Sequence, residues 1–140
     1  MTELSGRLRA VGDALPLQRG IRVLEVGCGP GAAAREVARR ISPGHVLGID
    51  RSATVIAQAL ARSCAEVEAG WLSFRKVAVE DFALEPGEAP FDLAFAVRVG
   101  ALDGRHPAAG RLAMAHLRTA LVPAGRLFVD GGDPLREVPL

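Results

Sequence analysis

Apolar runs and helical patterns alternate along the chain. Five short runs rich in apolar and β-branched residues predict strands at 21–26, 45–50, 72–79, 91–97 and 126–130. Apolar residues at helical spacing predict helices at 30–41, 53–69 and 107–122. Strands separated by helices form right-handed βαβ units, so the sequence predicts an α/β fold with a doubly wound, mostly parallel sheet of about five strands and helices on both faces.

Three other features follow from the same pattern. An amphipathic helix is predicted at 3–14; it either caps a ligand or covers one end of the sheet, and the sequence leaves both alternatives open. The residues from 80 to 90 are too rich in proline, glycine and acids for a regular helix and predict a surface connection. In the helices at 53–69 and 107–122 the expected inward residues include Ile56, Ala59, Leu60, Cys64, Leu112, Ala113 and Leu117.

Length and composition place the chain among single globular domains. It has 140 residues, of which 49% are hydrophobic, enough for one core. We expect one domain over 1–140, with a terminal helix in 1–19, a ligand-binding core at 20–131 and a tail at 132–140. The residues after the last predicted strand are expected to be a tail, so that strand is expected to expose an edge. A homodimer through this edge, or the residues from 131 to 140, would cover it.

Charge and cysteine content exclude several classes of protein. The formal net charge is +1 and the basic residues are scattered, which predicts no nucleic-acid partner. The first residues lack the apolar run of a signal peptide and no stretch is long enough to span a membrane, so we expect a cytoplasmic protein without a membrane partner. Cys28 and Cys64 lack metal-ligand spacing and are expected to be buried free thiols, with no metal bound.

The candidate site is the loop that follows the first predicted strand. Gly27 and Gly29 let a ligand lie directly on the main chain, and the N–H groups at the start of the next helix suit a negatively charged group. Asp50 ends the second strand, where a carboxylate accepts hydrogen bonds from ribose hydroxyls. The pattern therefore predicts a nucleoside-containing ligand.

Glu25 distinguishes between two such ligands. The spacing Gly27-x-Gly29-x-x-Ala32 also fits a dinucleotide-binding loop, which keeps an NAD-dependent oxidoreductase as an alternative. A carboxylate at position 25 would be poorly solvated and would repel a pyrophosphate, whereas it favours a ligand with an ammonium and a sulfonium group. Glu25 therefore disfavours NAD.

These residues resemble the motifs of class I S-adenosylmethionine-dependent methyltransferases. Residues 23–31, VLEVGCGPG, are similar to the first motif of that family, and 48–52, GIDRS, to the second; the similarity extends over about 20–131. The resemblance implies a Rossmann-like sheet in the order 3-2-1-4-5, S-adenosylmethionine as cofactor and S-adenosylhomocysteine as product. It places Glu25, Gly27, Cys28, Gly29 and Gly31 at the methionine end.

The same resemblance implies contacts for the rest of the cofactor. Asp50 would bind the ribose and Arg51 would lie near the adenine. Ala78 stands where the family often has a polar residue, a departure that Val79 or Glu80 would have to compensate. A cofactor-binding domain without catalytic activity is therefore an alternative, which the missing terminal strands also favour.

The predicted reaction is methyl transfer to a small-molecule acceptor. Orientation of an acceptor against an activated methyl group supplies much of the rate. His106, after the fourth strand, is the candidate general base; the alternative is an ordinary residue that precedes the helix at 107. Arg98 and Arg105 are candidates to hold an anionic acceptor; the alternative is that they are exposed arginines that only solvate the loop. His45 and His116 have no expected role.

Overall fold

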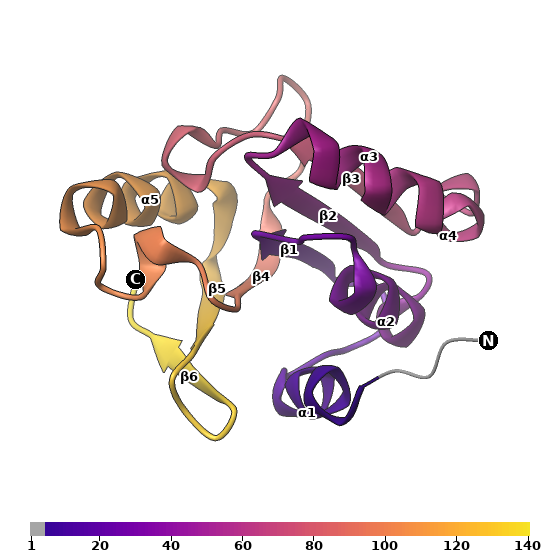
Figure 1. Cartoon of the computed structure of the whole chain (residues 1–140), viewed down its shortest axis with the longest axis horizontal. Helices are drawn as coiled ribbons and strands as arrows, with labels where there is room; N and C mark the ends of the chain where they lie inside the picture. The colour runs from indigo at the N-terminus through magenta and orange to yellow at the C-terminus, as the bar shows by residue number, and fades with distance from the viewer. Residues whose placement is uncertain (1–4) are drawn as a thin grey trace.

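A six-stranded sheet in the order β3-β2-β1-β4-β5-β6 runs through the centre of the molecule (Figure 1). The computed structural model describes residues 5–140. The first five strands are parallel and β6 pairs with β5 in the antiparallel sense. The predicted α/β class and the order 3-2-1-4-5 are confirmed, with one further strand. The strands are β1 (Arg22–Val26), β2 (His45–Asp50), β3 (Leu72–Lys76), β4 (Phe91–Ala96), β5 (Leu121–Asp130) and β6 (Leu135–Val138).

Helices cover both faces of this sheet. α1 and α2 pack together and belong to one layer, whereas α5 and the short 3₁₀ helix η1 lie together in the other (Figure 1). α3 packs against β2 and β3. The helices are α1 (Gly6–Ala14), α2 (Ala32–Ile41), α3 (Ala53–Arg62), α4 (Cys64–Glu68), η1 (Val79–Asp81), η2 (Gly100–Leu102) and α5 (Pro107–Ala120).

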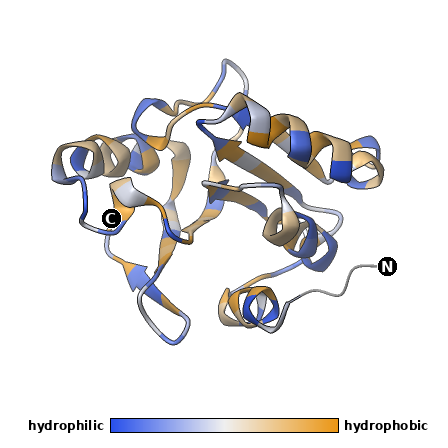
Figure 2. Cartoon of the chain, viewed as in Figure 1, coloured by the Kyte–Doolittle hydropathy of each residue, from blue (hydrophilic) through white to orange (hydrophobic). Residues whose placement is uncertain are grey.

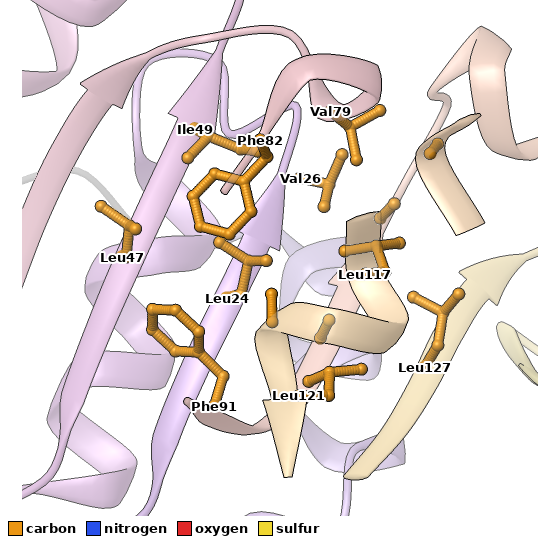
Figure 3. Close-up of a cluster of buried hydrophobic side chains, with 14 of the residues drawn as sticks. Leu24, Val26, Leu47, Ile49, Val79, Phe82, Phe91, Leu117, Leu121 and Leu127 are labelled. Atoms are coloured by element: carbon orange, nitrogen blue, oxygen red, sulfur yellow. The ribbon is translucent and has the colours of Figure 1, made fainter. Parts of the chain in front are cut away.

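Apolar side chains fill the space between the sheet and the helices. Figure 2 shows the hydrophobic colouring concentrated on the central strands, and polar colouring on the outer parts of the helices. Under α5, Leu24, Phe82 and Leu117 have no exposed surface and belong to the same cluster (Figure 3). Burial of one large apolar side chain stabilises a fold by about 1.5–3 kcal/mol, so this cluster holds β1, the strand that precedes the candidate loop, in place.

The core on the opposite face includes α1. Val11 and Leu15 are buried there in one cluster with residues of β1 and α2. Arg40 on α2 pairs with Asp13 at 2.8 Å, which ties the two helices together. This packing favours the second alternative, in which α1 covers one end of the sheet. Leu4 of the predicted helix lies outside the described residues.

Two predicted elements end earlier in the structure than the sequence predicts. β3 ends at Lys76 and the chain turns into η1 at Val79, where a longer strand was expected. The helix predicted at 53–69 breaks at Ser63, whose side chain is fully buried. The break turns Cys64 to the surface, so its expected burial is wrong, although both cysteines are free.

α5 also buries less than its apolar spacing predicts. Ala113, Leu117 and Ala120 face the core, whereas Leu112 is 54% exposed. The buried residues recur at intervals of four and three along one stripe, and Leu112 lies about 100° away from Ala113 around the helix axis. Leu60 of α3 was likewise expected inside and is exposed.

The last residues form a strand, where a tail was expected. β6 pairs with β5 from Leu127 against Val138 to Asp130 against Leu135. The edge of β5 is therefore covered by the chain itself, which was one of the two alternatives, and it is not free to pair with a second copy. None of the helices described between residues 5 and 140 combines the length and apolar character needed to cross a bilayer.

Candidate functional site

A cleft of about 750 Å³ opens at the carboxyl ends of the parallel strands. This is the edge of a doubly wound sheet at which ligands bind, because the strand order reverses between β1 and β4. One half of the cleft is formed by the ends of β1, β2 and β3, and the other half by the segment after β4 and the start of α5. Its lining residues are Val26, Gly27, Ile49–Arg51, Val77–Glu80, Arg98–Ala101 and Arg105–Ala109.

The glycine loop, residues 27–31, connects β1 to α2, and its first residue, Gly27, lines the cleft. Gly27 has φ 69° and Gly31 has φ 91°, backbone conformations that favour glycine. The Cys28 N–H donates to the Ile49 carbonyl at 2.9 Å, which attaches the loop to β2. α2 begins at Ala32 with Gly31 as its N-cap, two residues later than predicted, so the loop is longer and more open than the sequence indicated.

Glu25 lies on β1 just before this loop and is only 5% exposed. Its Oε1 atom is buried without a hydrogen-bond partner among the described residues. Burial raises the pKa of Glu25 well above its usual value, and the charge of Asp50 raises it further; the Ala34 backbone and Arg35 partly oppose this. A buried carboxylate oxygen with no partner is an acceptor for a cationic group that the chain itself does not supply.

Arg35 holds the outer side of the loop, which the sequence did not reveal. Its guanidinium donates from Nη1 to the Pro30 carbonyl at 2.9 Å and to the Ser63 hydroxyl at 3.0 Å. Ser63 is the fully buried residue at the break between α3 and α4. The two side chains are 28 positions apart, and no sequence motif links them, so this contact could be found only from the structure.

Asp50 at the end of β2 joins the loop to the next helix. Its Oδ2 accepts from the Gly29 N–H at 3.1 Å and its Oδ1 from the Ser52 N–H at 3.0 Å. Each carboxylate oxygen retains a second lone pair, and Asp50 lines the cleft. The carboxylate can therefore accept from a ribose while it holds the loop in place. Arg51, which follows, is exposed and also lines the cleft.

η1 forms the wall that faces Asp50. Val79 is 5% exposed and Glu80 is half-buried, and both line the cleft together with Ala78. The side chain of Ala78 is a methyl group and adds no polar group to this wall, and its carbonyl already accepts from the Asp81 N–H. The apolar surface suits the flat face of a purine, and Glu80 is the polar side chain within this segment of the lining.

The segment after β4 lies directly against the glycine loop. A methyl group added to Gly27 would come within 2.7 Å of Val99 Cγ2. Arg98 has φ 60°, and its N–H donates to Asp130 Oδ1 at 3.1 Å. A non-glycine residue in this conformation is uncommon, and it places the Arg98–Val99 turn beside the loop. Val99 was not singled out by the sequence analysis, because an isolated valine after a strand carries no signal.

His106 and Arg105 complete the second half of the cleft. His106 is the N-cap residue of α5, makes no capping hydrogen bond with its side chain and lines the cleft. Arg105 pairs with Asp103 at 2.7 Å. The structure is compatible with either interpretation of His106, because a helix N-cap residue with an uncommitted ring is also available to an acceptor.

The structure brings together most of the predicted site residues. Gly27, Asp50, Arg51, Glu80 and His106 line one cleft, with Val79 beside them. The remaining predicted residues, Glu25, Cys28, Gly29 and Gly31, lie in or behind the loop and do not line the cleft directly.

The side chains of Cys28, His45 and His116 are engaged within the fold. Burial raises the pKa of the Cys28 thiol to about 12, so Cys28 is an unreactive part of the loop. His45 bonds the Gly70 carbonyl and Ser73, and His116 bonds the Phe82 carbonyl. Within residues 5–140, no three His, Cys, Asp or Glu side chains are grouped as metal ligands would be.

Comparison with known proteins identifies the family. The chain matches the family described as "Methyltransferase domain" over residues 23–125. It is 39% identical over 125 residues to a ubiquinone biosynthesis O-methyltransferase of Xylella fastidiosa, covering 89% of this chain and 46% of the relative. It is 32% identical over 136 residues to an O-methyltransferase of Aspergillus nomiae, covering 93% of this chain and 57% of the relative.

A solved structure agrees with this match. The S-adenosyl-L-methionine (SAM)-dependent methyltransferase from Thiobacillus denitrificans, in complex with S-adenosyl-L-homocysteine, superposes with a TM-score of 0.68 at 26% identity. The match covers 90% of this chain and 48% of that one. The chain belongs to the methyltransferase domain family, and it spans about half the length of the relatives it matches.

Proposed function

We propose that this chain binds S-adenosylmethionine in the cleft and transfers its methyl group to a small-molecule acceptor. The observation that carries the proposal is the buried, unpartnered Oε1 of Glu25 directly behind the glycine loop. The cofactor's methionine end carries an ammonium group, which supplies the missing donor. A dinucleotide offers the loop a pyrophosphate instead, which the carboxylate would repel.

The glycine loop, Asp50 and η1 each fit one part of this cofactor. The open glycine loop accepts the methionine end, since Gly29 has no atom within 4 Å of the position a side chain would occupy. Asp50 accepts from the ribose hydroxyls, and the η1 wall with Val79 and Glu80 lies against the adenine. The complex of the Thiobacillus enzyme with S-adenosyl-L-homocysteine supports this choice of ligand.

When bound, S-adenosylmethionine would supply an activated methyl group on a positively charged sulfur. The residues of the chain have three tasks. The cleft walls hold the cofactor beside the loop, and the Arg98–Val99 turn positions the acceptor against it. His106 receives the proton of an acceptor that must lose one.

The extent of the cleft favours catalysis over cofactor binding alone. The space continues past the cofactor residues to Arg98, His106 and the first turn of α5, which leaves room for a second molecule. A non-catalytic domain would need no such extension. The names of the relatives, an O-methyltransferase and a ubiquinone biosynthesis O-methyltransferase, support a small organic acceptor.

Calorimetric titration of the wild type and Asp50→Ala tests the proposal. We expect S-adenosylhomocysteine to bind the wild type at one site and to bind Asp50→Ala at least tenfold more weakly, since the ribose loses a charged acceptor worth about 1.5–3 kcal/mol. Asp81→Ala is the matched control, because Asp81 is exposed in η1 and does not line the cleft. Equal binding by both variants would remove Asp50 from the site.

A further inference from the structure

The second half of the cleft is basic. Arg98, Arg105 and His106 line it, whereas the carboxylates that line the cavity, Asp50 and Glu80, belong to the half formed by β2 and η1. We call these three residues the basic wall. The wall is adjacent to the glycine loop, because Val99 next to Arg98 contacts the loop at Gly27. A methyl acceptor that lies beside the glycine loop would therefore also lie against the basic wall.

Arg98 provides the available charge of this wall. Arg105 is neutralised by Asp103 at 2.7 Å, but the guanidinium of Arg98 has no hydrogen bond or ion pair with any residue between 5 and 140. Elsewhere Arg39, Arg40 and Arg75 pair with carboxylates. An arginine that lines a cleft without a carboxylate partner is a binding group for an anion.

A second cavity of about 590 Å³ adjoins this half of the cleft and shares Ala101, His106 and Pro107 with it. Its floor is apolar and includes Leu127 and Val129, which are almost fully buried. Three arginines stand around it, from α5 and β6, and no Asp or Glu side chain lines it. These arginines are Arg111, Arg118 and Arg136.

The two cavities together have the chemistry of an amphipathic anion site. The apolar floor suits a hydrocarbon body, and the surrounding arginines attract negative charge toward the opening. Resting on the proposed function, we propose that the methyl acceptor is an organic acid, whose carboxylate binds Arg98 beside the glycine loop and whose apolar part extends past His106 into the second cavity. Arg98 is then a specificity-determining residue.

The test compares acids with their uncharged amides. Protein saturated with S-adenosylhomocysteine is titrated with octanoate and octanamide, and with cinnamate and cinnamamide, while ligand binding is followed by NMR. We expect at least one acid to bind about tenfold or more tightly than its amide, since a charge-assisted hydrogen bond to Arg98 is lost in the amide. Equal binding of acid and amide in both pairs, or no binding of either acid, overturns the inference.

Variants at Arg98 assign the effect to one side chain. Arg98→Asn is chosen because asparagine tolerates the positive φ of this position. It should reduce the preference for the acid about tenfold, and Arg98→Lys should restore part of it. The matched control is Arg9→Gln on α1, an exposed arginine that lines neither cavity and should change nothing.

Titration with S-adenosylhomocysteine separates this inference from the proposed function. Cofactor binding by the wild type, with an unchanged acid preference in Arg98→Asn, overturns the acceptor inference alone. Absence of cofactor binding by the wild type overturns the proposed function and the inference with it.

Discussion

Replacement of Glu25 by glutamine should stabilise the free protein and weaken its binding of the cofactor. Glu25 is 5% exposed, its Oε1 has no partner, and burial raises its pKa well above the usual 4.5. Above pH 4.5 the unfolded chain has released this proton while the folded chain still holds it. Folded stability is therefore lost as the pH rises from 4.5 toward the raised pKa.

The size of the effect follows from proton linkage. One proton held by the folded state alone changes the free energy of unfolding by at most about 1.4 kcal/mol per pH unit. Glutamine does not titrate, so the stability of Glu25→Gln relative to the wild type should grow with pH from 4.5 up to the raised pKa of Glu25 and stay constant above it. Glu36 and Glu88 have lowered pKa values, and their stabilising contributions are lost below this range, as the pH falls.

Urea unfolding of both proteins between pH 4.5 and 8, followed by circular dichroism, measures this difference. Glu68→Gln is the matched control, because Glu68 is an exposed glutamate on α4. For binding of S-adenosylhomocysteine the wild type should be the stronger of the two proteins. Glu25→Gln loses the charged partner of the ammonium group, worth about 1.5–3 kcal/mol, which weakens binding about 10-fold to 150-fold. A stability difference that does not vary with pH, or unchanged affinity, would refute this role of Glu25.

Three further predictions concern the loop, its support and the core. Gly27→Ala should displace the Val99 turn and abolish most cofactor binding in calorimetry, because the added methyl would lie 2.7 Å from Val99 Cγ2. Gly20 also has a positive φ, 90° against 69° for Gly27, but open space around it, so Gly20→Ala should retain binding. Arg35→Met should weaken cofactor binding by releasing the Pro30 carbonyl, as seen by calorimetry. Phe82→Ala should lower the free energy of unfolding by about 3–5 kcal/mol in urea, since this ring is fully buried.

Each of these predictions has a contrary result. Equal cofactor affinity of the Gly27 and Gly20 variants would mean that the contact with Val99 is not needed. Unchanged affinity in Arg35→Met, with Arg39→Met on the exposed side of α2 as control, would remove the contact with Pro30 from the support of the loop. A loss of less than 1.5 kcal/mol in Phe82→Ala, below the value expected for one buried large side chain, would contradict the packing under η1.

The sequence predicted the central part of the fold well because local and tertiary preferences agree there. β1, β2 and β4 are apolar nearly throughout, and a parallel strand buried on both faces requires that composition. The glycine loop and Asp50 follow such strands directly, so their meeting at one edge of the sheet could also be predicted. The position of Glu25 behind the loop followed from its place in β1.

Other features depend on tertiary contacts that periodicity does not contain. The break at Ser63 is accompanied by its bond to Arg35, and it turns Cys64 outward. β6 has two exposed polar residues between half-buried ends, so its sequence resembles a polar tail. Its pairing with β5 supplies the backbone bonds that make it a strand. The contact of Val99 with Gly27 joins residues far apart in sequence and needs the three-dimensional fold.

Titration of the wild-type chain with S-adenosylhomocysteine and with NAD, under the same conditions, tests most directly whether the glycine loop and the Glu25 side chain behind it bind a cationic nucleoside cofactor. The expected result is binding of S-adenosylhomocysteine at one site per chain and no detectable heat from NAD, because the buried carboxylate accepts the ammonium group and repels the pyrophosphate. Binding of NAD without binding of S-adenosylhomocysteine would contradict the proposed site.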